Sequence, residues 1–293
     1  MMKTNPLVTI VIPAYNHENF IIEAIESILS QSYDNIDLVI INDGSTDKTN
    51  EKIIKLASIC KNRFKNFSYT NRENKGLLKT LKEMENSIKG KYFSVLYSDD
   101  IFTKDRITKQ VKALEENEEY AMCYGKMIGI DQDSNIIKHY KYKHSKSGHI
   151  FNKLLNRNFI TAPTVMMRTE KFISVGGYDL NYAYDDYPLW LKLAQKNKIL
   201  FLNEELVFYR THQNNVSSDI IQTIKFTEKV LLSWKNEPAF KSAIKRFYLR
   251  SFYNLVKEKE KCKTEAKEYM LKALPYSFYD PRFLKALFRY FIL

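Results

Sequence analysis

Short apolar runs alternate with longer amphipathic stretches through the first third of the chain. The apolar runs are rich in β-branched and aromatic residues and predict buried strands at 7–12, 36–41, 67–70 and 92–97. Apolar residues at helical spacing predict helices at 20–30, 46–60 and 77–88. Strands that alternate with helices of this length are typical of right-handed βαβ units in a mostly parallel sheet. We therefore expect an α/β fold with helices flanking the sheet.

The pattern changes after a helix expected at 103–117. The runs 121–130 and 136–142 flank a polar turn and predict a β-hairpin. Farther along we expect a helix near 149, a strand at 165–168, a helix at 186–195 and two short strands ending at 210. From about residue 218 only helical patterns rich in Lys, Arg and aromatic residues remain. These patterns predict one domain of residues 1–217 and a helical C-terminal region of residues 218–293.

Composition and charge exclude several classes of protein. Among 293 residues, 46 Lys and Arg against 34 Asp and Glu give a net charge of +12, so we expect an anionic partner. The three cysteines, Cys60, Cys123 and Cys262, form no CxxC pair and indicate neither a disulfide framework nor a zinc site. The sequence shows no apolar leader and no run long enough to span a membrane. We expect a cytoplasmic protein that contacts a membrane, if at all, on its inner surface.

Three polar clusters directly follow predicted strands, at 13–16, 42–47 and 98–100. In an open parallel sheet the carboxyl ends of the strands meet at one edge, where ligands bind. Asp43, Asp99 and Asp100 would therefore lie close together, and close carboxylates repel one another unless a cation joins them. Oxygen ligands from adjacent acids suit Mg²⁺ or Mn²⁺, which bridge protein acids to substrate phosphates. The sequence thus predicts a divalent metal that neutralises a phosphate-bearing ligand.

Glycine usage excludes other phosphate-binding devices. The chain has eight glycines and neither a GxGxxG nor a GxxxxGK[ST] motif. This disfavours a kinase, a P-loop NTPase and a dinucleotide-dependent dehydrogenase.

Each cluster also has a purely structural interpretation. The segment 42–47 suits a turn followed by a helix N-cap, and Asp99 and Asp100 suit the start of a helix. Asp185 and Asp186 precede an amphipathic helix, where acids favour the helix dipole, or one of them is a general base. His212 is either a surface histidine or a contact to metal or diphosphate. The joint placement of three clusters at strand ends favours function.

These residues, in this order, resemble the family-two glycosyltransferases, which have the GT-A fold. The resemblance covers residues 6 to about 217 and rests on VIPAYN at 11–16, SILSQ at 27–31, NDGSTD at 42–47, NKG at 74–76, YSDD at 97–100, GGYD at 176–179, DDY at 185–187 and YRTH at 209–212. Similar members build bacterial surface glycans such as O-antigen, lipopolysaccharide and capsule. The resemblance therefore implies a GT-A, Rossmann-like, mostly parallel sheet flanked by helices, followed here by the C-terminal helical region.

The resemblance also implies a role for each site residue. Asp186 is the catalytic base, and Asp99 and His212 are metal ligands for Mn²⁺ or Mg²⁺. Asp43 binds the edge of the uracil and Tyr15 stacks near it. The remaining substrate-binding candidates lie beside these residues: Pro13, Asn16, Asp100 and Asp185.

Three positions depart from the family pattern. Tyr97 stands where an acid is frequent, and Leu81-Lys82 stand where Arg-Asn is frequent, so two contacts to the donor stay unassigned. Pro188 replaces another frequent acid next to the proposed base, which should leave Asp186 undisturbed.

The expected activity is transfer of a hexose, with glucose or galactose favoured, from a UDP-sugar to a hydroxyl with inversion at C1. The expected acceptor is a glycan or a polyprenyl-diphosphate-linked oligosaccharide. Two rivals are a sugar-nucleotide nucleotidyltransferase, which would need a Gly-rich loop after the first strand, and a non-catalytic nucleic-acid-binding protein. The acids at the predicted sheet edge argue against the second rival, and we expect no nucleic acid partner.

The C-terminal region carries basic residues beside aromatic ones. The segment 281–293 is mostly apolar with three cations, and 241–253 holds four cations among Phe and Tyr residues. Such segments suit an interfacial helix on anionic lipid. The alternative is that these helices pack on the catalytic domain or on a second subunit of a homo-oligomer.

Overall fold

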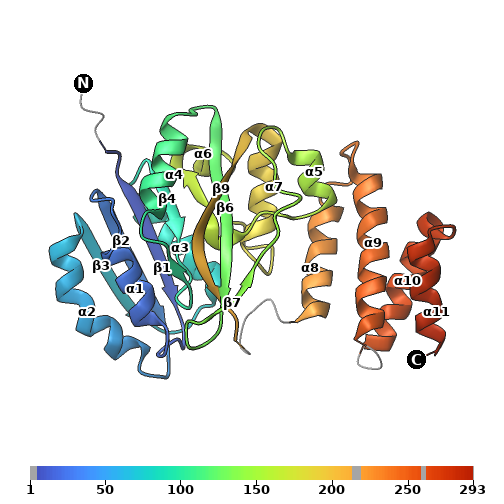
Figure 1. Ribbon diagram of the computed structural model, residues 1–293, viewed down its shortest axis with the longest axis horizontal. Coiled ribbons are helices and arrows are strands. Elements are labelled where there is room, and N and C mark those ends of the chain that lie inside the picture. Colours follow the sequence, from blue (N-terminus) through green and yellow to red (C-terminus); the bar gives the residue numbers. More distant parts are fainter. Residues whose placement is uncertain (1–4, 213–218, 259–261, 293) are drawn as a thin grey trace. The chain divides into compact units, whose positions relative to one another are not determined.

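The computed structural model describes residues 5–212, 219–258 and 262–292 (Figure 1). The chain forms two compact units, one of residues 1–150 with 159–212 and one of residues 151–158 with 213–293. The predicted domain boundary near residue 217 lies outside the described residues.

The first unit is built on one nine-stranded sheet whose main path runs β3-β2-β1-β4-β8-β6-β9-β5, with β7 paired to β6. Its strands are β1 (Val8–Ala14), β2 (Ile36–Asp43), β3 (Asn66–Arg72), β4 (Tyr92–Val95), β5 (Ile101–Phe102), β6 (Tyr120–Ile130), β7 (Ile136–His139), β8 (Met166–Arg168) and β9 (Lys198–Arg210). From β3 to β4 all neighbours are parallel, and beyond β4 the pairs are antiparallel except for β6 with β9. The predicted α/β class is confirmed.

Helices flank this sheet in the order that the alternating pattern predicts (Figure 1). They are α1 (Ile21–Leu29), α2 (Thr49–Arg63), α3 (Leu77–Met84), α4 (Arg106–Glu115), α6 (Thr169–Ser174) and α7 (Asp186–Lys196), with 3-10 turns at Glu85–Ser87 and Ala162–Thr164. Every residue of β1 and of β2 is buried, because helices cover both faces of a parallel sheet. Strand β3 at the sheet edge has only exposed and half-buried residues.

Most predicted elements match the observed ones, including the hairpin of β6 and β7. The prediction of two short strands ending at Arg210 is wrong, because β9 is one strand of 13 residues. The exposed residues Asn203–Glu205 interrupt the apolar pattern in the sequence. The pairing of β9 with β6 nevertheless continues along the strand, with shifts in register. The two-residue strand β5 and the short helix α6 were not predicted.

The second unit is helical. It contains α5 (Phe151–Asn156), α8 (Ile220–Leu232), α9 (Phe240–Lys257), α10 (Lys263–Ser277) and α11 (Pro281–Ile292). Phe252 on α9 and Phe283 on α11 are fully buried and their rings lie 5.5 Å apart. Within the described residues, no helix combines the length and the apolar character that crossing a membrane requires.

Candidate functional site

The first two polar clusters meet at the carboxyl edge of the sheet, as predicted from the parallel strands. Strands β1 and β2 run in register to Ala14 and Asn42. Just beyond them, the Asn16 amide donates to Ser45 Oγ at 2.9 Å, and the Thr46 amide donates to Asn16 Oδ1 at 2.8 Å. Asn16 has φ +50°, a left-handed conformation that Asn tolerates better than most residues, and this backbone geometry is common at functional sites.

The third cluster joins the same edge through the segment after β4. His17 Nδ1 lies 2.7 Å from Ser98 Oγ, and the His17 amide donates to Thr49 Oγ1 at 2.9 Å. Pro13 is buried inside β1, whereas the side chain of Tyr15 is 47% exposed and free to lie against a flat ligand. The predicted neighbourhood of the three clusters is therefore present in the structure.

Asp43 ends β2 with a buried carboxylate, 3% exposed, that already has several partners. Its oxygens accept the amides of Lys75 at 3.0 Å and Gly76 at 2.8 Å. Arg72 Nη2 lies 3.1 Å from Asp43 Oδ1 in an ion pair. A carboxylate offers about four lone-pair positions, so one remains on Oδ2 for a ligand.

Arg72, at the end of β3, is a candidate that the sequence did not reveal. Its Nη2 also binds Thr80 Oγ1 at 2.6 Å, which fixes the guanidinium beside Asp43. Its Nε and Nη1 are buried and have no hydrogen-bond partner within the described protein. Buried donors without partners are costly and rare in native proteins. Arg72 therefore has two buried donor atoms without a partner in the described protein, on a guanidinium that is held beside Asp43.

His17, Asp99 and His212 form a compact cluster of metal-ligand atoms, all within 4.8 Å of one another. His212 Nε2 lies 3.0 Å from Asp99 Oδ2, and both side chains are largely buried. The cluster brings together the two predicted ligands, Asp99 and His212, and adds His17, which the sequence analysis left unassigned. The sequence signal for His17 was its position directly after the first strand-end cluster. This signal is weak, because many polar loop residues follow strands.

The donor set of this cluster fits a divalent metal. Burial lowers the pKa of His17 despite the nearby Asp99 carboxylate, which favours the neutral imidazole that binds metals. Ser98 next to Nδ1 orients the ring, as partners of metal-binding histidines do. Two imidazoles with one carboxylate suit Mn²⁺ better than Mg²⁺, because Mg²⁺ prefers oxygen ligands alone. The cluster therefore offers nitrogen and oxygen donors together, whereas the adjacent acids Asp99 and Asp100 suggested oxygen donors alone.

The side chain of Asp100 contacts the backbone of Arg210 rather than the histidines of this cluster. It is 1% exposed, and its Oδ1 accepts the amide of Arg210 at 3.0 Å. Burial and the neighbouring charge of Asp99 raise its pKa well above the usual range. These contacts give Asp100 a structural role in joining the end of β9 to the segment after β4, and its assignment to the substrate stays a prediction.

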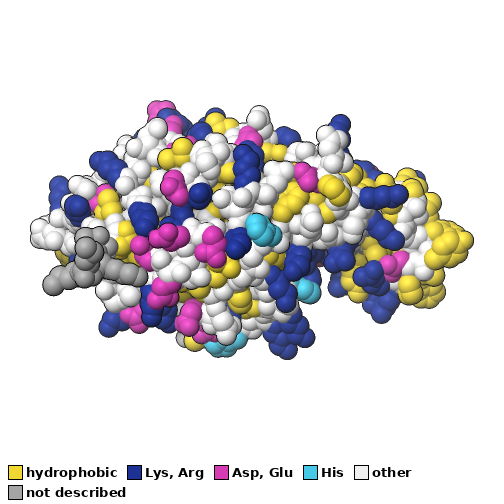
Figure 2. Space-filling view, turned by 90° about the horizontal axis from the view of Figure 1, so that it is seen from above, with side chains coloured by type: hydrophobic (Ala, Val, Ile, Leu, Met, Phe, Trp, Pro, Cys, Tyr) yellow, Lys and Arg dark blue, Asp and Glu magenta, His cyan; other side chains and the backbone are white. Residues whose placement is uncertain are grey.

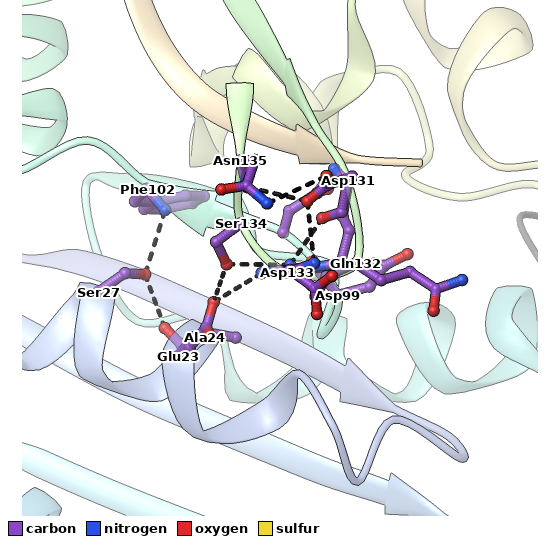
Figure 3. A network of polar contacts seen from close by, with 12 residues as sticks. Glu23, Ala24, Ser27, Asp99, Phe102, Asp131, Gln132, Asp133, Ser134 and Asn135 are labelled. Carbon is purple, nitrogen blue, oxygen red and sulfur yellow. Dashed lines mark hydrogen bonds and ion pairs between the residues drawn. The ribbon is translucent and has the colours of Figure 1, made fainter. Parts of the chain in front are cut away.

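The buried guanidinium of Arg210 anchors the loop that carries Asp99. It donates from Nε to the Asp99 carbonyl at 2.9 Å and from Nη1 to the carbonyls of Asp131 and Gln132, both at 2.9 Å. Its Nη2 pairs with Glu23 Oε2 at 2.7 Å. Figure 3 shows Glu23, Asp99 and the turn from Asp131 to Asn135 close together, and Ser134 Oγ donates to Glu23 Oε2 at 2.7 Å. Since His212 lies two residues beyond Arg210, one network positions both predicted metal ligands.

A second acid pair lies at the start of α7. Asp185 precedes the helix and Asp186 is its first residue, so both face the favourable end of the helix dipole. Tyr97 donates its hydroxyl to Asp185 Oδ2 at 2.9 Å. The position where the family frequently has an acid is therefore occupied by a tyrosine that binds the acid pair. This contact brings the two acids to the segment that carries Asp99.

Asp186 has the electrostatic character of a general base. Burial, with the charge of Asp185 as a second cause, raises the pKa of Asp186 to about 7. Burial also raises the pKa of Asp185, while the hydrogen bond from Tyr97 opposes this shift. A carboxylate with a pKa near the working pH is well matched to accept a proton.

Lys82, the other departure from the family pattern, is used inside the protein. Its Nζ pairs with Glu85 at 2.9 Å, and Leu81 is fully buried. Glu85 Oε1 in turn accepts the Tyr178 amide at 2.7 Å. Gly177 has φ +66°, and an added Cβ would lie 2.5 Å from Glu85 Oε1, so this glycine permits the close approach. The segment leading to the acid pair is thereby fixed to the turn after α3.

Comparison with known sequences identifies the family. The model of glycosyl transferase family 2 matches residues 9–176. An uncharacterized glycosyltransferase of Rickettsia typhi is 31% identical over 235 residues, which are 76% of this chain and 71% of the relative. Another, from Methanocaldococcus jannaschii, is 28% identical over 256 residues, 86% of this chain and 87% of the relative. Some relatives are longer, and the match spans 32% of one from Rickettsia felis.

Solved structures share the fold at low sequence identity. TarS 1-349 of S. aureus in complex with UDP has a TM-score of 0.68 and 13% identity, covering 98% of this chain and 91% of that one. A mannosyltransferase from Pyrobaculum calidifontis, in complex with GDP-Man and Mn²⁺, has a TM-score of 0.66 and 14% identity, covering 99% and 87%. The predicted GT-A fold is confirmed. Because the family model covers more than half of the sequence, the chain belongs to glycosyl transferase family 2.

Proposed function

We propose that this glycosyltransferase transfers a hexose from a UDP-sugar to an acceptor hydroxyl in one displacement that inverts C1. The observation that carries the proposal is the juxtaposition of two groups at one edge of the sheet. One is the cluster of His17, Asp99 and His212, and the other is the buried acid pair tied to Tyr97. The first suits a diphosphate with its metal, and the second suits the acceptor hydroxyl.

The pairing of Asp43 and Arg72 supports a base that presents an N–H next to a carbonyl. The free position on Asp43 Oδ2 accepts a hydrogen bond, and the unpaired Nε and Nη1 of Arg72 donate. Each of the four bases offers an N–H donor next to an acceptor, so this pair supports nucleotide binding without choosing among the bases. We favour uridine, with Tyr15 against the base and Asn16 shaping the loop.

The metal belongs at the cluster of His17, Asp99 and His212. When bound there, Mn²⁺ supplies positive charge that stabilises the diphosphate as it leaves. The chain's own part is to orient these three side chains through Ser98 and through the network of Arg210. The mannosyltransferase of similar fold was solved with GDP-Man and Mn²⁺, which supports the choice of ion.

Asp186 takes the proton from the acceptor hydroxyl as that oxygen attacks C1 of the sugar. The C1–oxygen bond to the diphosphate breaks as the new bond forms, so no protein nucleophile is needed and the configuration inverts. The hydrogen bond from Tyr97 favours the ionised form of Asp185, and the charge of Asp185 helps to raise the pKa of Asp186. The acceptor that we propose is a hydroxyl of a glycan or of a polyprenyl-diphosphate-linked oligosaccharide in bacterial surface-glycan synthesis. Glucose and galactose remain the favoured sugars.

A screen of donors and metals tests this function. Purified protein is mixed with UDP-Glc, UDP-Gal, UDP-GlcNAc, GDP-Man and dTDP-Glc, each with Mn²⁺, Mg²⁺ or EDTA. We expect a thermal shift and slow hydrolysis with a UDP-hexose and Mn²⁺, and neither with EDTA. A chain that is stabilised by none of these donors, but is retained on DNA at low salt, contradicts the proposal and favours the nucleic-acid alternative. Pyrophosphate-dependent formation of UTP from a UDP-sugar favours the nucleotidyltransferase instead.

A further inference from the structure

Helix α11 presents three separate faces along its length. Phe283 and Ala286 are fully buried and pack within the helical unit. Another face consists of large apolar side chains at helical spacing that are 48–73% exposed: Leu284, Phe288, Phe291 and Ile292. Beside it runs a stripe of exposed cations, Arg282, Lys285 and Arg289. A helix that only packed on its neighbours would not need a second apolar face.

The exposed apolar surface continues beyond α11. The turn that precedes the helix carries Phe278, 55% exposed, and Tyr279, 89% exposed. On α10, Leu271 and Leu274 are 55% and 39% exposed and share a helical face with Phe278. Figure 2 shows yellow side chains gathered over the C-terminal helices, with dark-blue ones beside them. Contiguous exposed apolar surface with a polar border marks a binding surface rather than ordinary exposure.

The aromatic residues of α9 do not belong to this surface. The sequence suggested that Phe247 and Phe252 lie exposed beside the cations of the same segment, but they are 7% and 0% exposed. They face the helical unit because its core needs large apolar side chains. We call the following exposed apolar residues of α10, α11 and the turn between them the C-terminal apolar face: Leu271, Leu274, Phe278, Tyr279, Leu284, Phe288, Phe291 and Ile292.

Charge decides which partner fits this face. From residue 213 onward the sequence has 16 Lys and Arg against 8 Asp and Glu, which gives +8 of the chain's total of +12. A second copy of the chain would bring the same positive charge to the contact, and like charges oppose association. An anionic lipid surface offers both the opposite charge and an apolar interior.

We propose that the C-terminal apolar face inserts into the surface of an anionic lipid bilayer, with Arg282, Lys285 and Arg289 at the level of the headgroups. An amphipathic helix with aromatic residues on one face and cations beside it lies in the plane of the membrane interface. Arginine and lysine extend to the headgroups while their carbon chains rest on apolar surface. This inference rests on the second unit alone and is independent of the proposed sugar donor.

Flotation of the full chain with lipid vesicles tests the inference. One set of vesicles contains equal parts of phosphatidylglycerol and phosphatidylcholine, and the other contains phosphatidylcholine alone. We expect the protein to float with the anionic vesicles at low salt and to bind the neutral ones at least tenfold more weakly. The double variant Lys285→Gln/Arg289→Gln should lose roughly tenfold or more in affinity for the anionic vesicles.

The apolar contribution is tested by Phe288→Ser/Phe291→Ser, which changes side chains that are 68% and 73% exposed. Because they are exposed, the melting temperature should stay unchanged while binding to anionic vesicles falls tenfold or more. The matched control is Ile54→Ser/Ile59→Ser on α2, which removes two apolar side chains that are 56% and 54% exposed. Control and wild type should bind equally.

Three results would overturn the proposal. The first is a wild-type chain that stays with neither kind of vesicle at low salt. The second is equal loss of binding in the α2 control and in the Phe288/Phe291 variant, which indicates nonspecific adsorption. The third combines two observations. Sedimentation velocity without lipid shows a wild-type dimer that dissociates in the Phe288/Phe291 variant, and the wild type does not bind vesicles. That last result assigns the face to a second copy of the chain.

Discussion

The hydroxyl of Tyr97 donates a hydrogen bond to Asp185 Oδ2 at 2.9 Å, and Asp185 directly precedes the proposed base, Asp186. The hydrogen bond stabilises the ionised form of Asp185, and the negative charge of Asp185 raises the pKa of its neighbour. The two acids therefore titrate as a pair, and the hydroxyl of Tyr97 favours ionisation of Asp185 within it. A position where the family frequently has an acid has here become a positioning residue for the base.

Replacing Tyr97 with Phe tests this positioning role. Without the hydroxyl, Asp185 holds a proton more readily and its charge no longer opposes ionisation of Asp186. We expect the acid limb of kcat/KM against pH to move to lower pH. The rate at the plateau should fall because Asp186 becomes a weaker base. The KM for the donor should be nearly unchanged.

The control for this experiment is Tyr124→Phe, which removes another buried hydroxyl that binds the backbone at Lys146. It should cost stability and leave the pH profile in place. If Tyr97→Phe and Tyr124→Phe shift the profile equally, or if neither does, Tyr97 has only a packing role.

Asp186→Asn should raise stability at alkaline pH while it removes activity. Its pKa is 3.8 in an unperturbed chain and about 7 when folded. The contribution of this group to stability is therefore present below about pH 4 and is lost as pH rises through about 7. At pH 8 the variant should be more stable by about 4 kcal/mol, because the pKa differs by about three units at about 1.4 kcal/mol each. Thermal melts at pH 4 and pH 8 measure the difference, which should vanish at the lower pH.

Asp179→Asn gives the opposite sign in the same segment. Asp179 pairs with Lys192 at 2.9 Å, and its hydrogen bond with Lys192 is the main cause that lowers its pKa. Its contribution is present above its unperturbed pKa and is lost as pH falls, so Asp179→Asn should lower stability at pH 8. A gain in stability at pH 8 in both variants would count against the electrostatic account of Asp186.

Each histidine of the metal cluster should be needed for tight binding of Mn²⁺. His17→Gln and His212→Gln each remove one of three ligand side chains, and we expect affinity for Mn²⁺ in the presence of UDP to fall tenfold or more. Electron paramagnetic resonance of free Mn²⁺ measures this without reference to turnover. His144→Gln, an exposed histidine outside the cluster, is the control and should bind as wild type does. Unchanged affinity in His17→Gln removes that residue from the ligand set.

The hydrogen-bonding groups of Asp43 and Arg72 predict which ligands raise the melting temperature most. Since Asp43 has one acceptor position left and Arg72 has two unpaired donor atoms, UDP and GDP should raise the melting temperature in Mn²⁺. Inorganic pyrophosphate carries the same two phosphates without a base, so it should shift the melting temperature much less. Equal shifts from UDP, GDP and pyrophosphate mean that the chain binds the phosphates without contacting the base.

The sequence was sufficient for features that depend on local pattern. Buried runs closed by polar residues predicted β1, β2 and β4, and parallel strands necessarily bring residues such as Asn16 and Ser45 together. His17 and Arg72 were missed because their roles depend on which strands are neighbours. Arg72 reaches Asp43 only because β3 pairs with β2, and His17 reaches His212 only because the end of β9 returns to that edge.

The orientation of a side chain was equally hidden. Adjacent acids Asp99 and Asp100 look alike in sequence, yet one faces the histidines and the other accepts the amide of Arg210. No periodicity distinguishes them, because the difference arises from the tertiary contact with β9. The C-terminal helices show the same limit, since helical pattern alone could not tell the buried Phe252 from the exposed Phe288.

Above all, we propose that Asp186 is the general base of a single displacement on a metal-bound UDP-sugar. The most direct measurement is proton NMR of the sugar that wild type and Asp186→Asn release from a UDP-α-hexose in water, recorded before the anomers equilibrate. Mg²⁺ replaces Mn²⁺ in the tube to avoid paramagnetic broadening. The account predicts that the β-anomer appears first with wild type and that the variant releases it at least 100-fold more slowly. First appearance of the α-anomer, or equal release by Asp186→Asn, would contradict it.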